Sequence, residues 1–285
     1  MFLEAATSGL FLAATYAIAA FGLVIVFGVL DILNFAHGAM LVLSAYLASS
    51  LIIGGVPYWV ALVGIVAVMA LAGMGLERTI FRRVEGEVIA GLVVSIGIIA
   101  IVDTAILRFW GPEPRTLPRL VEGSVSVGAA TLPVDRLLII AVVAVVLVLA
   151  QVALTRSRWG KVLRATAQQQ DAASLQGIPV DRVKTVAFGI GTALAALAGV
   201  VIASTVTFDT HLGESLVIKS FIVIIIGWVG STTGAMVGAS ILGFAEAFGS
   251  AYFGVAVAQL IPLIALAAVL LVRPHGIFGR RLERV

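Results

Sequence analysis

The sequence contains no cysteine and few charged residues. The absence of cysteine excludes disulfides, thiol catalysis and cysteine-ligated metals, so the chain needs no particular redox compartment. Charged residues make up 12% of the 285 positions and hydrophobic residues 61%, whereas soluble domains are about a quarter charged and about half apolar. This is the composition of a membrane protein, and the net charge of +3 indicates membrane topology signals rather than nucleic-acid binding.

Long apolar runs fill most of the chain. They approach the ~20 residues that an α-helix needs to cross a bilayer, and they lack the alternation of a transmembrane β-barrel. We therefore predict an all-α, polytopic integral membrane helical bundle with about eight or nine transmembrane helices, some short or broken, in a single domain over residues 1–285. The expected spans are 9–30, 38–53, 58–76, 88–107, 137–154, 183–206, 216–229, 235–253 and 255–272.

Basic residues gather in three regions, 78–83, 156–184 and 273–284. Lys and Arg near helix ends are retained on the cytoplasmic side of a membrane. We therefore expect these three regions, and the C-terminus, to be cytoplasmic, and the N-terminus to lie outside. The first span lacks a basic segment before it and is expected to be retained as a helix.

The loop 156–182 has the composition of a structured element. Good helix formers run from Lys161 to Leu175, Gly177 stands where a helix C-cap would lie, and Pro179 follows. The pattern predicts short surface helices. Their apolar positions could dock into a groove of a partner protein, or the loop could be a solvated connector with a basic fringe.

The segment 34–38, Asn-Phe-Ala-His-Gly, separates two apolar spans without a proline. Polar groups at membrane depth are tolerated where they line protein or water, and they often mark pathways. Two interpretations are open. The segment is either a broken helix that lines a translocation path, or a cap in which Asn34 satisfies helix-end backbone groups and His37 is merely hydrogen-bonded.

Two acidic residues, Asp103 and Glu246, lie within predicted spans. An acid at the bilayer centre costs about 2.5 kcal/mol or more, so both are expected to face the bundle interior. They could serve as hydrogen-bonding groups in helix packing or as a proton relay. We expect no Lys or Arg buried in a span that would demand a carboxylate.

Motifs of enzymatic chemistry are missing. Gly160-Lys161 is followed by Val162 rather than Ser or Thr, so the chain has no P-loop, and it has neither a Gly-x-Ser-x-Gly nor a His-Glu-x-x-His motif. We predict a non-enzyme without metal or cofactor. If ATP supplies the energy, it is hydrolysed on another chain. The alternative is a self-sufficient channel or secondary transporter in which Asp103 or Glu246 binds a proton or sodium.

Several motifs resemble those of known transporters. Asp171-Ala172-Ala173, three residues and Gly177 resemble the Glu-Ala-Ala-x-x-x-Gly signature of bacterial ABC importer permeases. Over nearly its whole length the chain is similar to the LivH-type permeases of branched-chain amino acid ABC importers. The matching segments are 16–46 around Asn34 to Gly38, Glu77-Arg78 with Arg82 and Arg83, Ser95-Ile96-Gly97, 156–183, 227–234, Glu246 and 273–279.

This resemblance implies roles for particular residues. The loop 156–182 would couple to the ATPase, and the path would include the broken segment and two further positions. The implied coupling residues are Lys161, Arg164, Asp171, Ala172, Ala173 and Gly177, and the implied path residues are Asn34, His37, Ser95 and Trp228. The family usually has glycine in place of Trp228. The identity of the solute is therefore less certain than its chemical class.

The resemblance also implies partners and a location. The chain would act with a second related permease, two cytoplasmic ATPase subunits that bind the ATP, and a periplasmic solute-binding protein. It would lie in the bacterial inner membrane. Branched-chain or other hydrophobic amino acids are the expected solutes, with urea, short amides and aromatic acids as alternatives.

Overall fold

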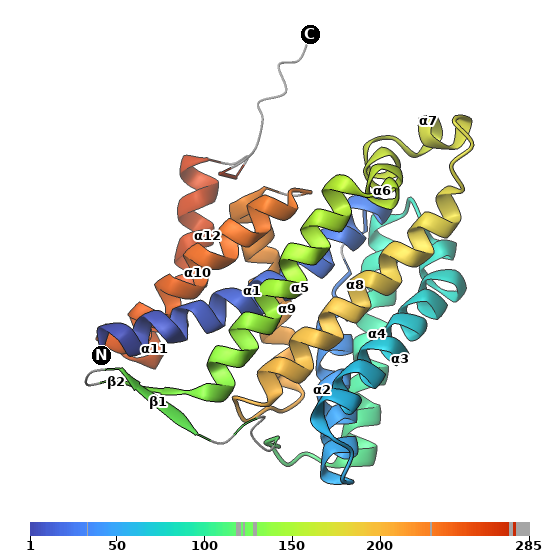
Figure 1. The fold of residues 1–285 in the computed structure, drawn as a ribbon. Helices are drawn as coiled ribbons and strands as arrows, with labels where there is room; N and C mark the ends of the chain where they lie inside the picture. Colours follow the sequence, from blue (N-terminus) through green and yellow to red (C-terminus); the bar gives the residue numbers. More distant parts are fainter. Residues whose placement is uncertain are drawn as a thin grey trace.

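The protein is described here by a computed structural model (Figure 1), which covers residues 1–32, 34–117, 121, 123–127, 130–228, 230–273 and 276–277. The described chain is a helical bundle with one short β-hairpin. Its elements are α1 (Phe2–Leu30), α2 (Ala36–Ile53), α3 (Tyr58–Thr79), η1 (Phe81–Val84), α4 (Val88–Trp110), β1 (Ser124–Val127), β2 (Ala130–Pro133), α5 (Val134–Arg156), α6 (Arg158–Gln168), α7 (Gln170–Leu175), α8 (Val180–Ala203), α9 (His211–Gly227), α10 (Thr232–Phe253), α11 (Val255–Ala258) and α12 (Ile261–Val272).

The predicted polytopic bundle is confirmed. Each expected span falls on a helix, and eight segments of the described chain are long and apolar enough to cross a membrane. Helix α9 has only 17 residues, and the last expected span is divided into α11 and α12. The antiparallel hairpin of β1 and β2 was not predicted. Residue 229 and most of the 273–279 motif lie outside the described residues.

Helices α1 and α8 form the centre of the bundle. In their most apolar windows 78% and 83% of residues are buried, against 17% in α5. Small residues let neighbouring backbones approach closely, as is usual in membrane bundles. A Cβ added to Gly191 would meet the carbonyl of Gly22, and one added to Gly243 would meet the backbone of Ala13. The outer helices keep apolar side chains exposed, as lipid-facing or partner-facing helices do.

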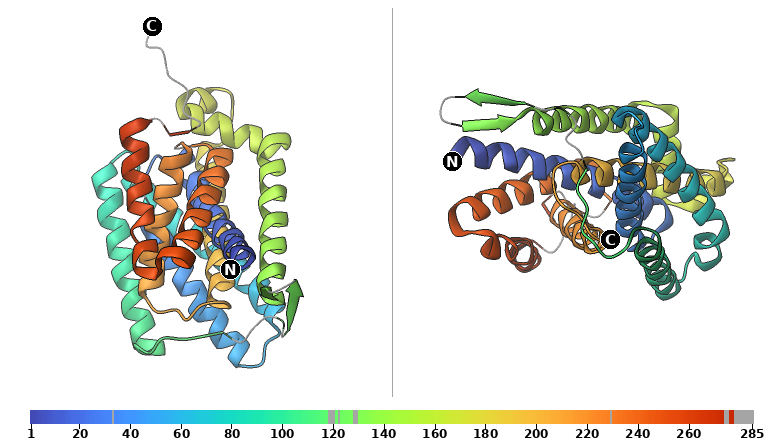
Figure 2. Two further views of the ribbon diagram at one scale, coloured as in Figure 1. Left: turned by 90° about the vertical axis from the view of Figure 1, so that its left-hand side faces the viewer. Right: turned by 90° about the horizontal axis from the view of Figure 1, so that it is seen from below.

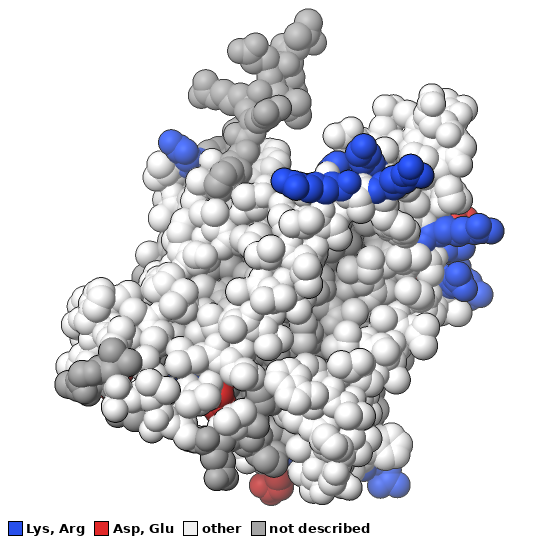
Figure 3. Space-filling model, viewed as in Figure 1, with Lys and Arg blue, Asp and Glu red and all other residues white. Residues whose placement is uncertain are grey.

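The two ends of the bundle differ in charge. Helices α6 and α7 lie at one end, where Lys and Arg gather in Figure 3, and the hairpin lies toward the other end, leading into α5 (Figures 1 and 2). The element η1 belongs to the basic end, because Arg82 donates to Thr185 near the start of α8 at 2.8 Å. Arg82 also holds the fully buried Glu77 through two hydrogen bonds of 3.1 and 3.0 Å.

Candidate functional site

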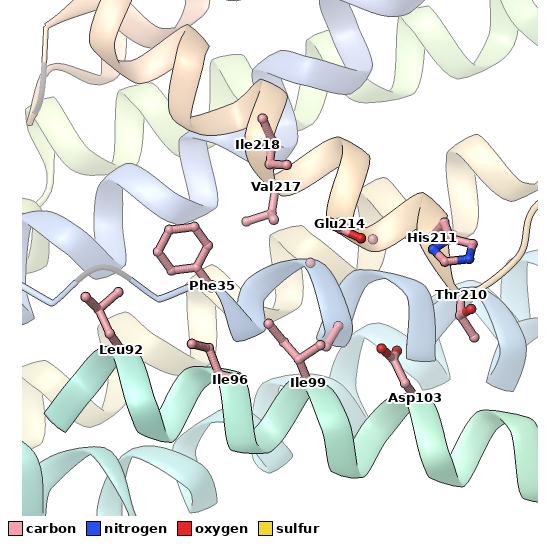
Figure 4. Close-up of a pocket in the computed structure, with 13 residues that line it drawn as sticks. Phe35, Leu92, Ile96, Ile99, Asp103, Thr210, His211, Glu214, Val217 and Ile218 are labelled. Atoms are coloured by element: carbon pink, nitrogen blue, oxygen red, sulfur yellow. The ribbon is translucent and has the colours of Figure 1, made fainter. Parts of the chain in front are cut away.

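A groove of about 490 Å³ lies between α2, α4 and α9 (Figure 4). Helix α4 contributes residues spaced by three and four positions, which places them on one face of the helix. The groove is lined by Phe35, Gly38, Ala39, Leu92, Ile96, Ile99, Asp103, Thr210, His211, Gly213, Glu214, Val217 and Ile218. Most of this lining is apolar, which suits a solute with a hydrocarbon portion.

The polar groups of the groove are concentrated toward one end. Figure 4 shows Asp103, His211 and Glu214 toward the end opposite Phe35 and Leu92. Two carboxylates and an imidazole therefore share this end, and the lining contains neither Lys nor Arg. The groove consequently has an apolar portion and a portion that attracts positive charge. Asp103, which the sequence singled out, belongs to this second portion.

Two glycines set the separation of the helices that form the groove. A Cβ added to Gly38 would meet the carbonyl of Gly213, and one added to Gly213 would meet the carbonyl of Gly38. The rings of Phe35 and Phe221 pack nearby with centroids 4.8 Å apart. Helices α2 and α9 thus cross in direct backbone contact, which only glycine permits here.

The predicted break before α2 is present. Helix α1 ends at Leu30, Asp31 adopts a left-handed conformation (φ 54°), and α2 starts at Ala36. Asn34 is buried, and its Oδ1 has no hydrogen-bond partner among the described residues. His37 is buried with Nε2 3.1 Å from the carbonyl of Ala19 in α1. The break therefore presents Phe35 and Gly38 to the groove, and His37 to α1.

The four predicted path residues lie outside the groove lining. Ser95 is fully buried, and its hydroxyl donates to the Gly91 carbonyl at 2.9 Å within α4. Trp228 follows the far end of α9 with φ 110°. None of Asn34, His37, Ser95 and Trp228 lines the groove, so their role in a path stays a prediction. Sequence reasoning missed most of the apolar groove residues, because nothing in a uniformly apolar helix marks the face that will line a cavity.

The loop 156–182 forms the predicted surface helices, α6 and α7. Gly177 has φ 79° after α7, as a C-cap glycine does. Lys161, Asp171, Ala172 and Gly177 are exposed, whereas Ala173 is buried. Arg164 donates to the carbonyls of Leu154 and Thr155 at the end of α5, so it fastens α6 to the bundle. A role of these residues in coupling to an ATPase stays a prediction.

The junction of α6 and α7 contacts the end of α1 and faces the two interruptions of the bundle across a hollow. The Gln170 amide donates to the Val29 carbonyl at 3.0 Å, near the end of α1. A hollow of about 360 Å³ separates this junction from Asp31 and from Gly230, which lies between α9 and α10.

A buried charge cluster joins α1, α9 and α10. The Lys219 ammonium lies 2.5 Å from Glu246 Oε1 and 3.0 Å from the Tyr16 hydroxyl, which donates to Glu246 Oε2 at 2.7 Å. The expectation that no Lys lies buried in a span is wrong for Lys184, which is 4% exposed at the start of the expected span 183–206. Lys219 is partly buried, with its side chain 20% exposed. Glu246 faces the interior as predicted. The signal that could have found the cluster was one Lys and one Glu of opposite charge within two apolar spans.

Comparisons with known proteins find the same group of transport permeases by family model and by sequence. Residues 5–271 match the family model described as the branched-chain amino acid transport system permease component. The chain is 33% identical to the high-affinity branched-chain amino acid transport system permease protein LivH of Escherichia coli K12, covering 98% of this chain and 96% of that protein. It is 30% identical to BraD of Pseudomonas aeruginosa, a protein of the same description, over 98% and 96%.

A more distant relative and a solved structure extend the comparison. The probable branched-chain amino acid transport permease protein LivH of Methanocaldococcus jannaschii is 25% identical, over 93% of this chain and 90% of that protein. The structure of PsaBC from Streptococcus pneumoniae in complex with Fab matches with a TM-score of 0.54 at 13% identity, covering 94% of this chain and 91% of that chain. This last likeness concerns the fold alone.

Proposed function

The chain belongs to the family of permease components of branched-chain amino acid transport systems, and from this premise we propose that it forms part of the membrane passage of an ATP-driven importer for hydrophobic amino acids. It is a multi-pass membrane transport component, not an enzyme. The observation that carries the proposal is the groove between α2, α4 and α9, which combines apolar walls with acidic groups toward one end.

The groove matches the chemistry of such a solute. A branched-chain amino acid carries an alkyl group, an ammonium group and a carboxylate, and the groove offers partners for the first two. Leu92, Ile96 and Ile99 provide an apolar wall for the alkyl group, and Asp103 and Glu214 attract the ammonium at the other end. Urea has no alkyl portion, short amides have only a small one, and neither carries an ammonium, so hydrophobic amino acids fit the groove better.

Energy would enter through the surface helices. ATP-bound ATPase subunits would bind α6 and α7, where Leu175 is 86% exposed. The apolar side of a short helix commonly docks into a groove of a partner protein in this way. Movement of these helices would pass through the Gln170 contact to α1 and so to the groove, as a rigid-body shift. Lys161, Asp171, Ala172 and Gly177 would lie at this docking surface, with Ala173 and Arg164 holding it to the bundle.

The assembly would contain a second related permease, two ATPases and a periplasmic solute-binding protein in the bacterial inner membrane. The basic end of the bundle would face the cytoplasm, since Lys and Arg loops are retained there. The C-terminus would then be cytoplasmic and the N-terminus outside. A placement of Asn34, His37, Ser95 and Trp228 along the path belongs to the same proposal, with these residues moving toward the passage as the groove opens.

Reconstitution tests the proposal. The full complex in proteoliposomes should accumulate leucine only with ATP, and the chain alone should not. Uptake by the chain alone would instead favour a secondary transporter, and accumulation of urea but not leucine would contradict the solute class.

Gly177→Trp places a bulky residue at the docking surface and should abolish uptake while leaving the assembled bundle folded. Gly55→Trp, at another glycine with a positive φ and open space around it, is the matched control.

A further inference from the structure

We propose that the pocket beside Lys219 and Glu246 is a second solute site, which binds the zwitterionic head of an α-amino acid. This pocket has a volume of about 420 Å³ and lies on the other side of α9 from the groove. It is lined by Leu12, Ser215, Lys219, Glu246, Ser250, Val255, Ala258 and Gln259. The inference rests on the function proposed above and assigns a further step to it.

The charged pair has hydrogen-bonding capacity left for a ligand. An ammonium has three donors, and Lys219 uses two of them, on Glu246 and Tyr16. A carboxylate can accept about four hydrogen bonds, and Glu246 accepts one at each oxygen. An α-carboxylate can therefore bind Lys219 and an α-ammonium can bind Glu246 while the internal pair stays intact.

The remaining polar residues of the pocket are also available. Within the described residues, the side chains of Ser215, Ser250 and Gln259 make no recorded hydrogen bond, although all three line the pocket. Charged groups in membrane helices are costly and tend to mark functional sites, and a buried ion pair is weak evidence for a purely stabilising role. A polar pocket next to such a pair is suited to a small zwitterion.

The pocket complements the groove. The groove lining has carboxylates but neither Lys nor Arg, so a zwitterion finds no cation there. A third hollow joins the two sites around the start of α9, because it shares His211 with the groove and Ser215 with the Lys219 pocket. An amino acid held by both charges beside α9 could thus pass around the start of this helix to the groove.

Binding measurements on the assembled complex in nanodiscs test the site. Saturation-transfer NMR would titrate L-leucine, 4-methylpentanoate, which lacks the ammonium, and isoamylamine, which lacks the carboxylate. The wild type should bind leucine about tenfold or more tightly than either analogue, since each loses one charge-assisted contact. The variant Lys219→Met/Glu246→Met should lose the preference for leucine over isoamylamine, because the groove has carboxylates but no cation for the leucine carboxylate. An unchanged preference in the folded double variant would overturn the inference.

A second variant keeps the charged pair and covers the case in which the double variant fails to fold. Ser250→Leu fills the pocket and should weaken leucine binding about tenfold. Unchanged binding in Ser250→Leu would also overturn the inference. Lys184→Met/Glu85→Met removes an equivalent Lys–Glu pair elsewhere and should leave the preference for leucine intact. Wild-type uptake with ATP alongside unaltered binding in these pocket variants would refute the second site while leaving the proposed function standing.

Discussion

The variant Gly38→Ala tests whether the α2–α9 contact sets the width of the groove. The new Cβ would lie 2.9 Å from the Gly213 carbonyl carbon and 2.9 Å from the Val217 Cβ, and closer still to the Gly213 carbonyl oxygen. Ordinary contacts of a Cβ begin near 3.4 Å. The opposing atoms include backbone, so α2 and α9 must separate by about 0.5 Å or more to relieve the overlap.

The expected change in the stability of Gly38→Ala is the sum of two opposing effects. Overpacking a tight contact costs about 1–3 kcal/mol, and replacing a helical glycine by alanine returns up to about 1 kcal/mol. Because the overlap is with backbone rather than with a flexible side chain, the cost lies toward the upper end, about 2–3 kcal/mol, and the expected net loss of stability is about 1–2 kcal/mol. Because the α2–α9 contact positions two of the helices that line the groove, leucine uptake by the reconstituted complex should fall about tenfold or more. A small displacement of a precisely positioned binding site has an effect of this size.

Thermal unfolding and ATP-driven uptake would be measured on the same preparations. Gly97→Ala is the matched control, because it makes the same chemical change in α4 where a Cβ meets nothing within 4 Å. It should unfold at or above the wild-type temperature and transport normally. Wild-type stability and uptake in Gly38→Ala would refute the reasoning that this close contact defines the groove.

Three further variants probe other parts of the account. Arg82→Met should lower the free energy of unfolding by about 3–5 kcal/mol, because it leaves the buried Glu77 carboxylate without its cation. Arg82→Met/Glu77→Met should regain most of this stability in thermal unfolding, and a double variant as unstable as Arg82→Met would contradict a charge effect. Gln170→Ala removes the hydrogen bond from the Gln170 amide to α1 and should raise the number of ATP molecules hydrolysed per leucine imported, whereas Gln176→Ala should not. Equal ratios in the two variants would argue that this hydrogen bond does not couple the surface helices to α1. Trp228→Gly should be more stable than Trp228→Ala by about 1–3 kcal/mol, because φ is 110°; the reverse order would exclude backbone strain there.

The sequence predicts most of the fold, because a membrane helix reveals itself by length and apolarity alone. An interruption between the first two spans was also predictable, but the predicted segment 34–38 lies too far along the chain, because α1 ends at Leu30 and α2 begins at Ala36. The division into α11 and α12 was not predicted, although Gln259 and Pro262 in this segment were a usable signal, since proline is common in the first turn of a helix. Trp228 shows the same limit: its φ of 110° is a backbone conformation that favours glycine, and only the structure reveals it.

The sites were less predictable than the spans. Ile96 differs in no local property from Ile101, yet only Ile96 lines the groove, because the choice depends on where α2 and α9 pack. The cluster of Tyr16, Lys219 and Glu246 joins residues up to 230 positions apart. Such pairing is decided by tertiary packing, although two opposite charges in apolar spans were a usable hint.

Cysteine accessibility tests most directly that the groove is the solute path. The chain has no cysteine, so Ile96→Cys and Ile101→Cys each carry a single thiol on α4 at positions that are 61% and 71% exposed. A charged methanethiosulfonate should label Ile96→Cys in the reconstituted complex and block uptake, and leucine should protect it, because the groove admits water and solute. Ile101→Cys, outside the groove, should label slowly without loss of transport. Equal labelling of both thiols, or no protection of Ile96→Cys by leucine, would contradict the account.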